Sequence, residues 1–250
     1  MLVHRRARFF LSIFVAALLP TTSAAVLSGP AAAVAAPKAA KCPAAANDET
    51  AAVRAAAACH GRVEVLADRD EKTQVFANAN GSFTAESAAL VQRVHDSAGR
   101  WVKPDPTLHR DTAGRIVPAA TSLRLSFSGG GTADAATIGK GRSKLGLRWP
   151  GALPAPRLGG ANATYADVLP GVDLVLTAQA EGFAEMLVVK TPAAAANPAL
   201  AAVRFATTAS GLRLRQDTAG ALTAVDDSGA TLFGSGTPVM WDSTKPPWKL

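Results

Sequence analysis

The chain has 250 residues, of which 48% are hydrophobic and 6% aromatic, and its formal charge is +7 at neutral pH. This length accommodates one large domain or two small ones. The lysines and arginines are scattered singly, without the basic stripe that is typical of nucleic-acid-binding proteins. Nucleic acid is therefore excluded as the expected partner.

Residues 1–36 have the organisation of a secretory signal peptide. A basic stretch from His4 to Arg8 precedes an apolar run from Phe9 to Leu19, and small residues follow Pro20. The apolar run is too short to span a bilayer, which argues against the alternative of a membrane anchor. We expect an exported protein.

Signal cleavage fits the Ala-Val-Ala pattern at 33–35, with a cut near 24–25 as the alternative. Either cut removes three arginines and no acidic residue, so that the charge falls from +7 to +4. A weak, non-specific attraction to anionic cell-wall polymers is compatible with this charge. The expected location is extracellular or cell-wall associated, with no stable membrane insertion after cleavage.

Cys42 and Cys59 are the two cysteines of the chain. In an oxidising compartment such a pair forms a disulfide bond more often than any other arrangement. Neither cysteine has Cys or His partners at metal-ligand spacing, so we expect no metal site. His60 directly follows Cys59 and is not placed to act as its base.

Residues 37–60 read as an Ala-rich linker with one short helix. Asn47 or Asp48 can cap this helix, an acidic residue lies in its first turn, and Gly61 can end it. An alanine face buries little apolar surface. The helix is therefore expected at the edge of a larger domain or as a spacer.

Residues 61–242 change to short apolar runs of period near two, separated by Gly, Asp and Pro, and 197–203 is expected to be a helical interruption capped by Asn197. This pattern predicts an all-β, antiparallel sandwich-like domain that is either continuous or divided into two packed halves, 61–150 and 151–242. The expected strands are 62–66, 73–77, 89–95, 100–103, 121–127, 143–149, 172–177, 183–189, 202–206, 211–215, 221–225, 230–233 and 238–241.

Four segments of similar sequence predict hairpin turns: 96–100, 111–115, 217–221 and 226–230. Each places an Asp ahead of a Gly. The Asp side chain can cap the turn, and the Gly can adopt the left-handed conformation that such loops require.

The segment 168–190 predicts a hairpin with one strand covered on both faces. Pro170-Gly171 forms the entering turn, and Val172, Leu174 and Leu176 alternate toward the core. The apolar residues of the second strand do not alternate strictly, which predicts a bulge between 183 and 188.

Motifs of known catalytic sites are absent from the sequence. There is no Gly-x-Ser-x-Gly or His-Glu-x-x-His, and the glycine-rich segments 128–132 and 139–143 do not match a phosphate-binding loop, so we interpret them as flexible β-loops. Asp173 and Glu185 are the weak catalytic candidates, as a carboxylate pair for glycoside hydrolysis. The alternative for Asp173 is structural: hydrogen bonds from backbone amides of a neighbouring loop would lower its pKa.

Aromatic residues beside turns are candidates for a sugar-stacking platform. Trp149, Tyr165 and Trp241 are the weak binding candidates, because exposed rings stack on sugar faces. The alternative is that these rings belong to the core, where Trp is usually largely buried.

Seven segments between residues 61 and 243 occur in a recognisable order: VEVLADRDEKTQVFANANGSFTAE, GRWVKPDPTL, LSFSGGG, LRWPGALPAPRL, ATYADVLPGVDLVLTAQAEGFAEMLVVK, AANPAL and PVMWDS. Together they resemble the amino-terminal region of large actinobacterial secreted proteins. Those proteins commonly continue into laminin-G-like, DNRLRE-type or RHS-repeat domains. The resemblance implies no activity for the region itself.

The resemblance also implies that residues 243–250 are a linker or a truncated end, because relatives typically continue beyond it. The expected function is that of a secreted, non-catalytic β-rich module with a scaffold, adhesion or glycan-binding role, whose partner is a cell-wall or extracellular polysaccharide. No cofactor is expected. The alternatives are a secreted glycoside hydrolase and an assembly domain of an RHS-repeat export system.

Overall fold

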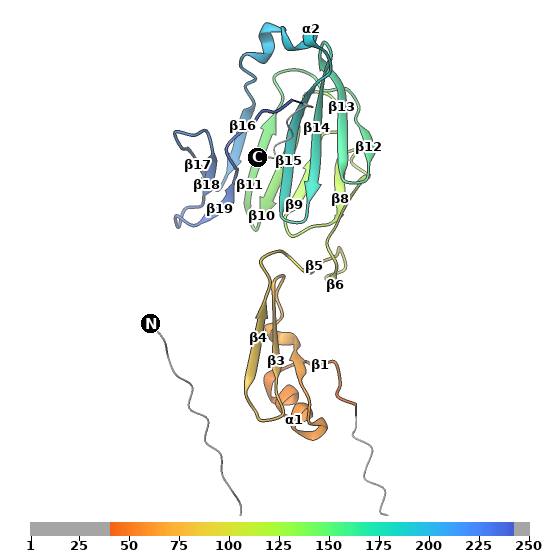
Figure 1. Cartoon of the computed structure of the whole chain (residues 1–250), viewed down its shortest axis with the longest axis vertical. Helices are drawn as coiled ribbons and strands as arrows, with labels where there is room; N and C mark the ends of the chain where they lie inside the picture. The colour runs from red at the N-terminus through yellow and green to blue at the C-terminus, as the bar shows by residue number, and fades with distance from the viewer. Residues whose placement is uncertain (1–40, 243–250) are drawn as a thin grey trace, which may run out of the picture. The chain divides into compact units, whose positions relative to one another are not determined.

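The computed structural model describes residues 41–242, and it confirms an all-β, antiparallel, sandwich-like architecture (Figure 1). The expected signal peptide, residues 37–40 and residues 243–250 lie outside this description. Within 41–242, no helix is long and apolar enough to cross a membrane.

The first part of the described chain is a small unit of one helix and four strands. Strand β1 (Ala45–Ala46) pairs in parallel with β2 (Val63–Val65), and β3 (Thr73–Ala77) and β4 (Phe83–Ser87) extend the sheet in antiparallel fashion. A single 3-10 turn, η1 (Leu66–Asp68), follows β2.

Helix α1 (Glu49–Cys59) packs on this sheet. Asp48 caps it, and its carboxylate accepts a hydrogen bond from the Ala51 amide at 2.8 Å. The helix ends at His60, which takes the left-handed conformation with φ of 54°. Because alanine side chains are small, the fully buried Ala52 and Ala56 let the helix approach the valines of β2 closely.

Cys42 and Cys59 form a disulfide bond, as the sequence predicts. The bond fastens the end of α1 to the segment that precedes β1. The expected boundary between a linker at 37–60 and a domain starting at 61 is therefore wrong: β1 and α1 share a sheet and a core with β2 and β3. The alanine face that was expected to bury little forms one side of this core.

Reduction of the disulfide should lower the free energy of unfolding by about 3 kcal/mol, because the bond restricts the unfolded chain. Urea denaturation followed by circular dichroism measures this change. A Cys42→Ser variant should match the reduced wild type and should not respond to dithiothreitol. An unchanged wild-type curve in dithiothreitol would contradict the prediction.

Residues 105–234 form the sandwich. Its larger sheet has six strands in the order β16-β11-β10-β9-β8-β7, and the facing sheet has the order β12-β13-β14-β15. A three-stranded sheet, β17-β18-β19, completes the fold, and β5 and β6 pair separately as a short hairpin. The bounds are β5 Val94–His95, β6 Trp101–Val102, β7 Asp105–Arg110, β8 Ile116–Ala120, β9 Arg124–Phe127, β10 Ala136–Lys140, β11 Ser143–Arg148, β12 Arg157–Gly159, β13 Asn162–Leu169, β14 Val172–Gln179, β15 Gly182–Val189, β16 Ala206–Ser210, β17 Arg213–Gln216, β18 Leu222–Val225 and β19 Thr231–Gly234.

The main core lies between the two larger sheets. Phe127 of β9 and Ile116 of β8 meet Tyr165 of β13 and Leu174 of β14 in one buried cluster. This core takes side chains from both of the ranges that the alternative of two packed halves separates, 61–150 and 151–242. Strand β16 also crosses that division to pair with β11.

The hairpin of β14 and β15 confirms the alternation expected from 168–190. Val172, Leu174 and Leu176 are buried toward the core, and β14 lies between β13 and β15. Gly171 has φ of 71°, and a Cβ at this position would lie 2.8 Å from the Cβ of Ala194, so only glycine fits the turn.

The expected bulge at 183–188 is wrong. The register of β14 and β15 runs unbroken from Val172↔Val189 to Gln179↔Gly182. The irregularity lies in β13 instead, between Tyr165 and Leu169, where Asp167 adopts φ of 50°. Parity along β15 did not locate the irregularity because the additional residues belong to β13, which lies on the other side of β14.

The four Asp-x-x-Gly turns share one hydrogen-bond scheme, as predicted. In each turn the Asp carboxylate accepts from the amides two and four residues later, at 2.9–3.0 Å. Their glycines have φ between 73° and 88°. These turns are Asp96 to Arg100, Asp111 to Arg115, Asp217 to Ala221 and Asp226 to Ala230.

The connection at 190–201 contains two short turns. Helix α2 (Pro192–Ala195) was not expected, and η2 (Pro198–Leu200) is a single 3-10 turn. The predicted cap is confirmed, because the Asn197 side chain accepts a hydrogen bond from the Ala199 amide at 3.0 Å.

Candidate functional site

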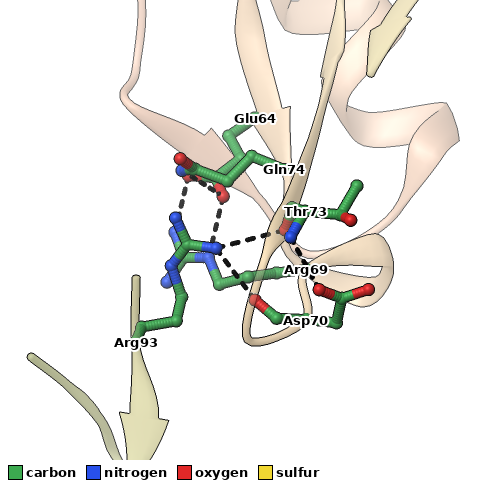
Figure 2. Close-up of polar contacts among 6 residues, drawn as sticks. All are labelled: Glu64, Arg69, Asp70, Thr73, Gln74 and Arg93. Carbon is green, nitrogen blue, oxygen red and sulfur yellow. Dashed lines mark hydrogen bonds and ion pairs between the residues drawn. The ribbon is translucent and has the colours of Figure 1, made fainter. Parts of the chain in front are cut away.

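The most buried charged residue among 41–242 is Glu64 on β2, which is 5% exposed. Arg69 binds its carboxylate with two hydrogen bonds, of 2.8 and 2.6 Å, and Gln74 of β3 adds a third of 2.8 Å. Figure 2 shows these side chains together, with Arg93 reaching the loop that carries Asp70. The Arg93 guanidinium donates to the Asp70 carbonyl at 2.8 Å.

The electrostatics of this cluster fit a structural role. Burial acts to raise the pKa of Glu64, but the hydrogen bonds from Arg69 and Gln74 and the charges of Arg69 and Arg93 lower it overall. The carboxylate therefore stays ionised, and its oxygens are occupied by protein donors. A general acid needs the opposite arrangement, a raised pKa and access to substrate.

Asp173 holds a neighbouring loop, as the structural alternative predicts. Its carboxylate accepts from the Asp167 amide at 2.8 Å and from the Lys190 ammonium at 2.8 Å. The Lys190 hydrogen bond and the Asp167 amide lower the pKa of Asp173. The same ammonium also contacts the exposed Asp167 carboxylate, so one lysine joins β13, β14 and the end of β15.

Replacing Asp173 with Asn should destabilise the fold at neutral pH and have little effect in acid. Because folding lowers the pKa of this carboxyl from its usual 3.8, its contribution is complete above about pH 4 and is lost as pH falls through the folded value. Melting temperatures between pH 7 and pH 2 measure this dependence. Asp167→Asn is the control, since it removes an exposed contact with the same lysine. A pH-independent difference between wild type and Asp173→Asn would contradict the assignment.

Asp173 and Glu185 do not form a carboxylate pair. Glu185 pairs with Leu176, whose side chain faces the core, whereas Asp173 lies on the other face of β14. The two acids therefore point to opposite sides of one sheet, and the expected pairing is wrong. Spacing along the sequence could not reveal this, because a difference of one residue reverses the face.

Glu185 is an inward-facing acid on an edge strand. Part of its surface is exposed to solvent, because β15 is an edge strand. Desolvation of the carboxyl on the inner face nevertheless raises its pKa. Inward-pointing charges on edge strands discourage pairing with another chain. This role accounts for Glu185 without chemistry.

Tyr165 and Trp149 belong to the core, and the expectation that they form a sugar platform is wrong. Tyr165 is fully buried, and its hydroxyl donates to the Ser128 carbonyl at 2.6 Å. Trp149 is 4% exposed and packs edge-to-face against Phe205, with ring centroids 5.5 Å apart.

The Tyr165 hydrogen bond also anchors the segment 128–132, which was expected to be a flexible loop. Ser128 is buried, and the amide and carbonyl of Gly131 both bond to Leu153 at 2.8 Å. Glycines serve close packing here, since a Cβ on Gly130 would lie 3.3 Å from the Ala155 amide nitrogen.

Trp241 is the one predicted ring that is accessible. It is 42% exposed in the irregular segment after β19, where a strand was expected at 238–241. Val239 and Met240 beside it are also exposed, so no sheet edge accepts this segment.

The outer face of the six-stranded sheet carries an open groove. Two depressions of about 470 and 530 Å³ share four lining residues from β9, β10, β11 and the β7–β8 turn. These residues are Arg115, Ser126, Thr137 and Lys144.

Cross-strand register places two rows of side chains on this face. One row contains the hydroxyls of Ser126, Thr137 and Thr208 around Gly146, and we call it the hydroxyl row. Ser126 and Thr137 share a hydrogen bond of 2.7 Å. The Asp134 carboxylate lies over Gly146, where it accepts from Thr208 at 3.2 Å and pairs with Arg148 at 3.1 Å.

The second row, which we call the basic row, consists of Arg124, Gly139 and Lys144. Gly139 pairs with Arg124 on one side and with Lys144 on the other. The Arg124 guanidinium lies across Gly139, 3.2 Å from where a Cβ would be, and donates to the Gly141 carbonyl. Lys144 is exposed and contacts no acidic group within the described residues.

Sequence reasoning did not find this face, because its residues come from four strands. The one local signal is the run Lys140-Gly141-Arg142-Ser143-Lys144, with three cations in five residues. The register adds Arg124 from β9 to that cluster. The cations are thus scattered along the chain, as expected, but they gather in space.

The described residues contain no group of three or more His, Cys, Asp and Glu side chains placed to share a metal ion. No family model, curated protein or solved structure matches the chain. The groove on the six-stranded sheet therefore has to be interpreted from its own chemistry.

Proposed function

We propose that this chain is an exported, non-catalytic β-sandwich module that attaches to polysaccharide through the outer face of its six-stranded sheet. The observation that carries the proposal is the groove, which is lined by hydroxyl and cationic side chains on adjacent strands. Sugar hydroxyls both donate and accept hydrogen bonds, and Ser126 and Thr137, which line both depressions, can do the same.

The rigid, open shape of the groove favours the binding of a long polymer over the enclosure of a small molecule. Its residues lie on paired strands, so the backbone holds them in fixed positions. The two depressions follow one another along an open face, in contrast to the enclosed sites that bury most of a small ligand. An extended polymer can contact both at once.

Export is the second part of the proposal. It is supported by the disulfide between Cys42 and Cys59, because such bonds persist in oxidising compartments. The signal-like organisation of residues 1–36 agrees with it. In this role the chain would be the leading module of a larger adhesive protein, as the sequence resemblance implies.

Affinity electrophoresis tests the binding function. The chain is run in native gels that contain dextran, soluble cellulose derivatives, chitosan or alginate, with an empty gel and bovine serum albumin as controls. At least one polysaccharide should retard the chain and not the albumin. Equal mobility in every gel would overturn the proposal of a polysaccharide-binding module.

A further inference from the structure

We propose that the ligand of the outer face is a carboxylate-bearing polysaccharide, and that the basic row selects its acidic sugars. This inference rests on the proposed function and specifies the chemistry of its ligand. It starts from Arg124 of β9 and Lys144 of β11, two exposed cations that have no acidic partner among the described residues.

The charges on this face are unbalanced at one end. Asp134 is paired with Arg148, and Arg115 is paired with Asp111 at 2.7 Å, so those groups neutralise one another. Arg124 is held by a carbonyl oxygen, and Lys144 contacts no carboxylate within 41–242. The groove therefore presents net positive charge at the basic row.

The β10–β11 turn extends this charge beyond the sheet. Lys140 and Arg142 are exposed, and neither side chain makes a hydrogen bond or an ion pair with a described residue. Lys140 has the parity of the buried Ile138, so Arg142 is the turn residue that adds to Arg124 and Lys144. Like charges placed together destabilise a protein surface. An anionic ligand would relieve this repulsion.

Geometry makes Arg124 a preorganised donor. Two of its guanidinium nitrogens lie 3.2 and 3.5 Å from where a Cβ of Gly139 would be, so a larger residue there would shift it. Lys144 pairs with the same glycine from the other strand, so the two cations are two strand spacings apart, about 10 Å at their Cα atoms. A carboxylate lying between Arg124 and Lys144 would be reached from both sides.

The density of charge distinguishes a polysaccharide from a nucleic acid. Duplex DNA carries about one charge per 1.7 Å of its axis, and its binding sites neutralise several phosphates at once. The groove instead places its cations beside a row of hydroxyls, and neither row contains an aromatic side chain on which a base could stack. Sparse acidic groups among many hydroxyls are the pattern of an acidic polysaccharide.

Titration calorimetry on the full chain tests this inference with alginate as the carboxylate polymer. Dextran is the neutral comparison, and polyphosphate and single-stranded DNA are the comparisons for other anions. The wild type should bind alginate more tightly than all three, and its affinity should fall as salt increases. Lys144→Glu should weaken alginate binding at least tenfold, and Lys144→Gln should weaken it less.

Lys41→Glu is the matched control, because it makes the same change in charge on an exposed lysine of the N-terminal unit. It should leave alginate binding nearly unchanged, and circular dichroism should show all variants folded. Equal losses in Lys41→Glu and Lys144→Glu would overturn the inference, since net charge alone would then explain binding. Polyphosphate or DNA binding as tight as that of alginate would also overturn it.

The two proposals fail in different ways. If dextran binds as tightly as alginate and Lys144→Glu has no effect, the acidic ligand is wrong and the polysaccharide-binding function stands. If no polysaccharide binds in the calorimeter or the gels, both proposals are wrong.

Discussion

Trp149→Ala should lower the free energy of unfolding by about 3–5 kcal/mol, the range for removing a large aromatic side chain from a packed core. Trp149 is 4% exposed at the end of β11 and packs against Phe205, which precedes β16. Its removal would leave a cavity beside two paired strands of the six-stranded sheet. The groove on the other face of that sheet depends on their register.

Trp241→Ala is the control for this prediction. The ring is 42% exposed, so its removal should change stability by no more than about 0.5 kcal/mol. Urea denaturation followed by circular dichroism compares the two variants without relying on tryptophan fluorescence. Equal destabilisation by both changes would contradict the assignment of Trp149 to the core.

Glu64→Ala should lower the free energy of unfolding by about 3 kcal/mol, because it leaves Arg69 partly buried without its partner. The loss of one partner of a buried ion pair usually costs about 3–5 kcal/mol. We expect the lower end of this range, since 21% of the Arg69 side chain is exposed to solvent. The loss should be largest in the small unit of β1 to β4, where Gln74 also loses its acceptor. Hydrogen exchange at the amides of β2 and β3 localises the effect.

The exposed pair of Arg62 and Glu86 provides the control. Its side chains are about half exposed (49% and 51%), so Glu86→Ala makes the same change in charge at a cost of about 1 kcal/mol or less. A double variant, Glu64→Ala with Arg69→Ala, should recover part of the loss because no charge is left unpaired. If Glu64→Ala and Glu86→Ala are equally mild, the buried cluster does not stabilise the unit.

Local chemistry made part of this fold predictable from the sequence. The Asp-x-x-Gly turns, the Asp48 cap and the alternation of Val172, Leu174 and Leu176 each depend on residues close together in the chain. The structural role of Asp173 was also accessible, since a carboxylate beside a turn accepts nearby amides. In these places local preference and tertiary structure agree.

The strands that were missed depend on their partners instead. Strand β13 is rich in residues of low strand preference, β8 contains Pro118, and β10 contains Gly139, yet each is paired with a neighbouring strand on both sides. Conversely, 238–241 is apolar but has no sheet edge to join. The alternation of apolar residues describes one segment only, and it does not show which neighbouring strand that segment can pair with.

The candidate site was missed for the same reason. Trp149 and Tyr165 have the composition of a binding platform, but the packing of two sheets places both inside. Lys144 and Arg124 are isolated in sequence and become neighbours through the register of three strands. A site made by register has no compact motif, so it appears only when the strand order is known.

Chemical footprinting of Lys144 tests the central claim, that polysaccharide binds the outer face of the six-stranded sheet, most directly. The chain is acetylated briefly with and without the polysaccharide that retards it most in native gels, and mass spectrometry measures modification at each lysine. Bound polysaccharide should protect Lys144 several-fold and leave the exposed Lys41 unchanged. Modification of Lys144 at the same rate in the bound and free chain would show that the ligand binds elsewhere.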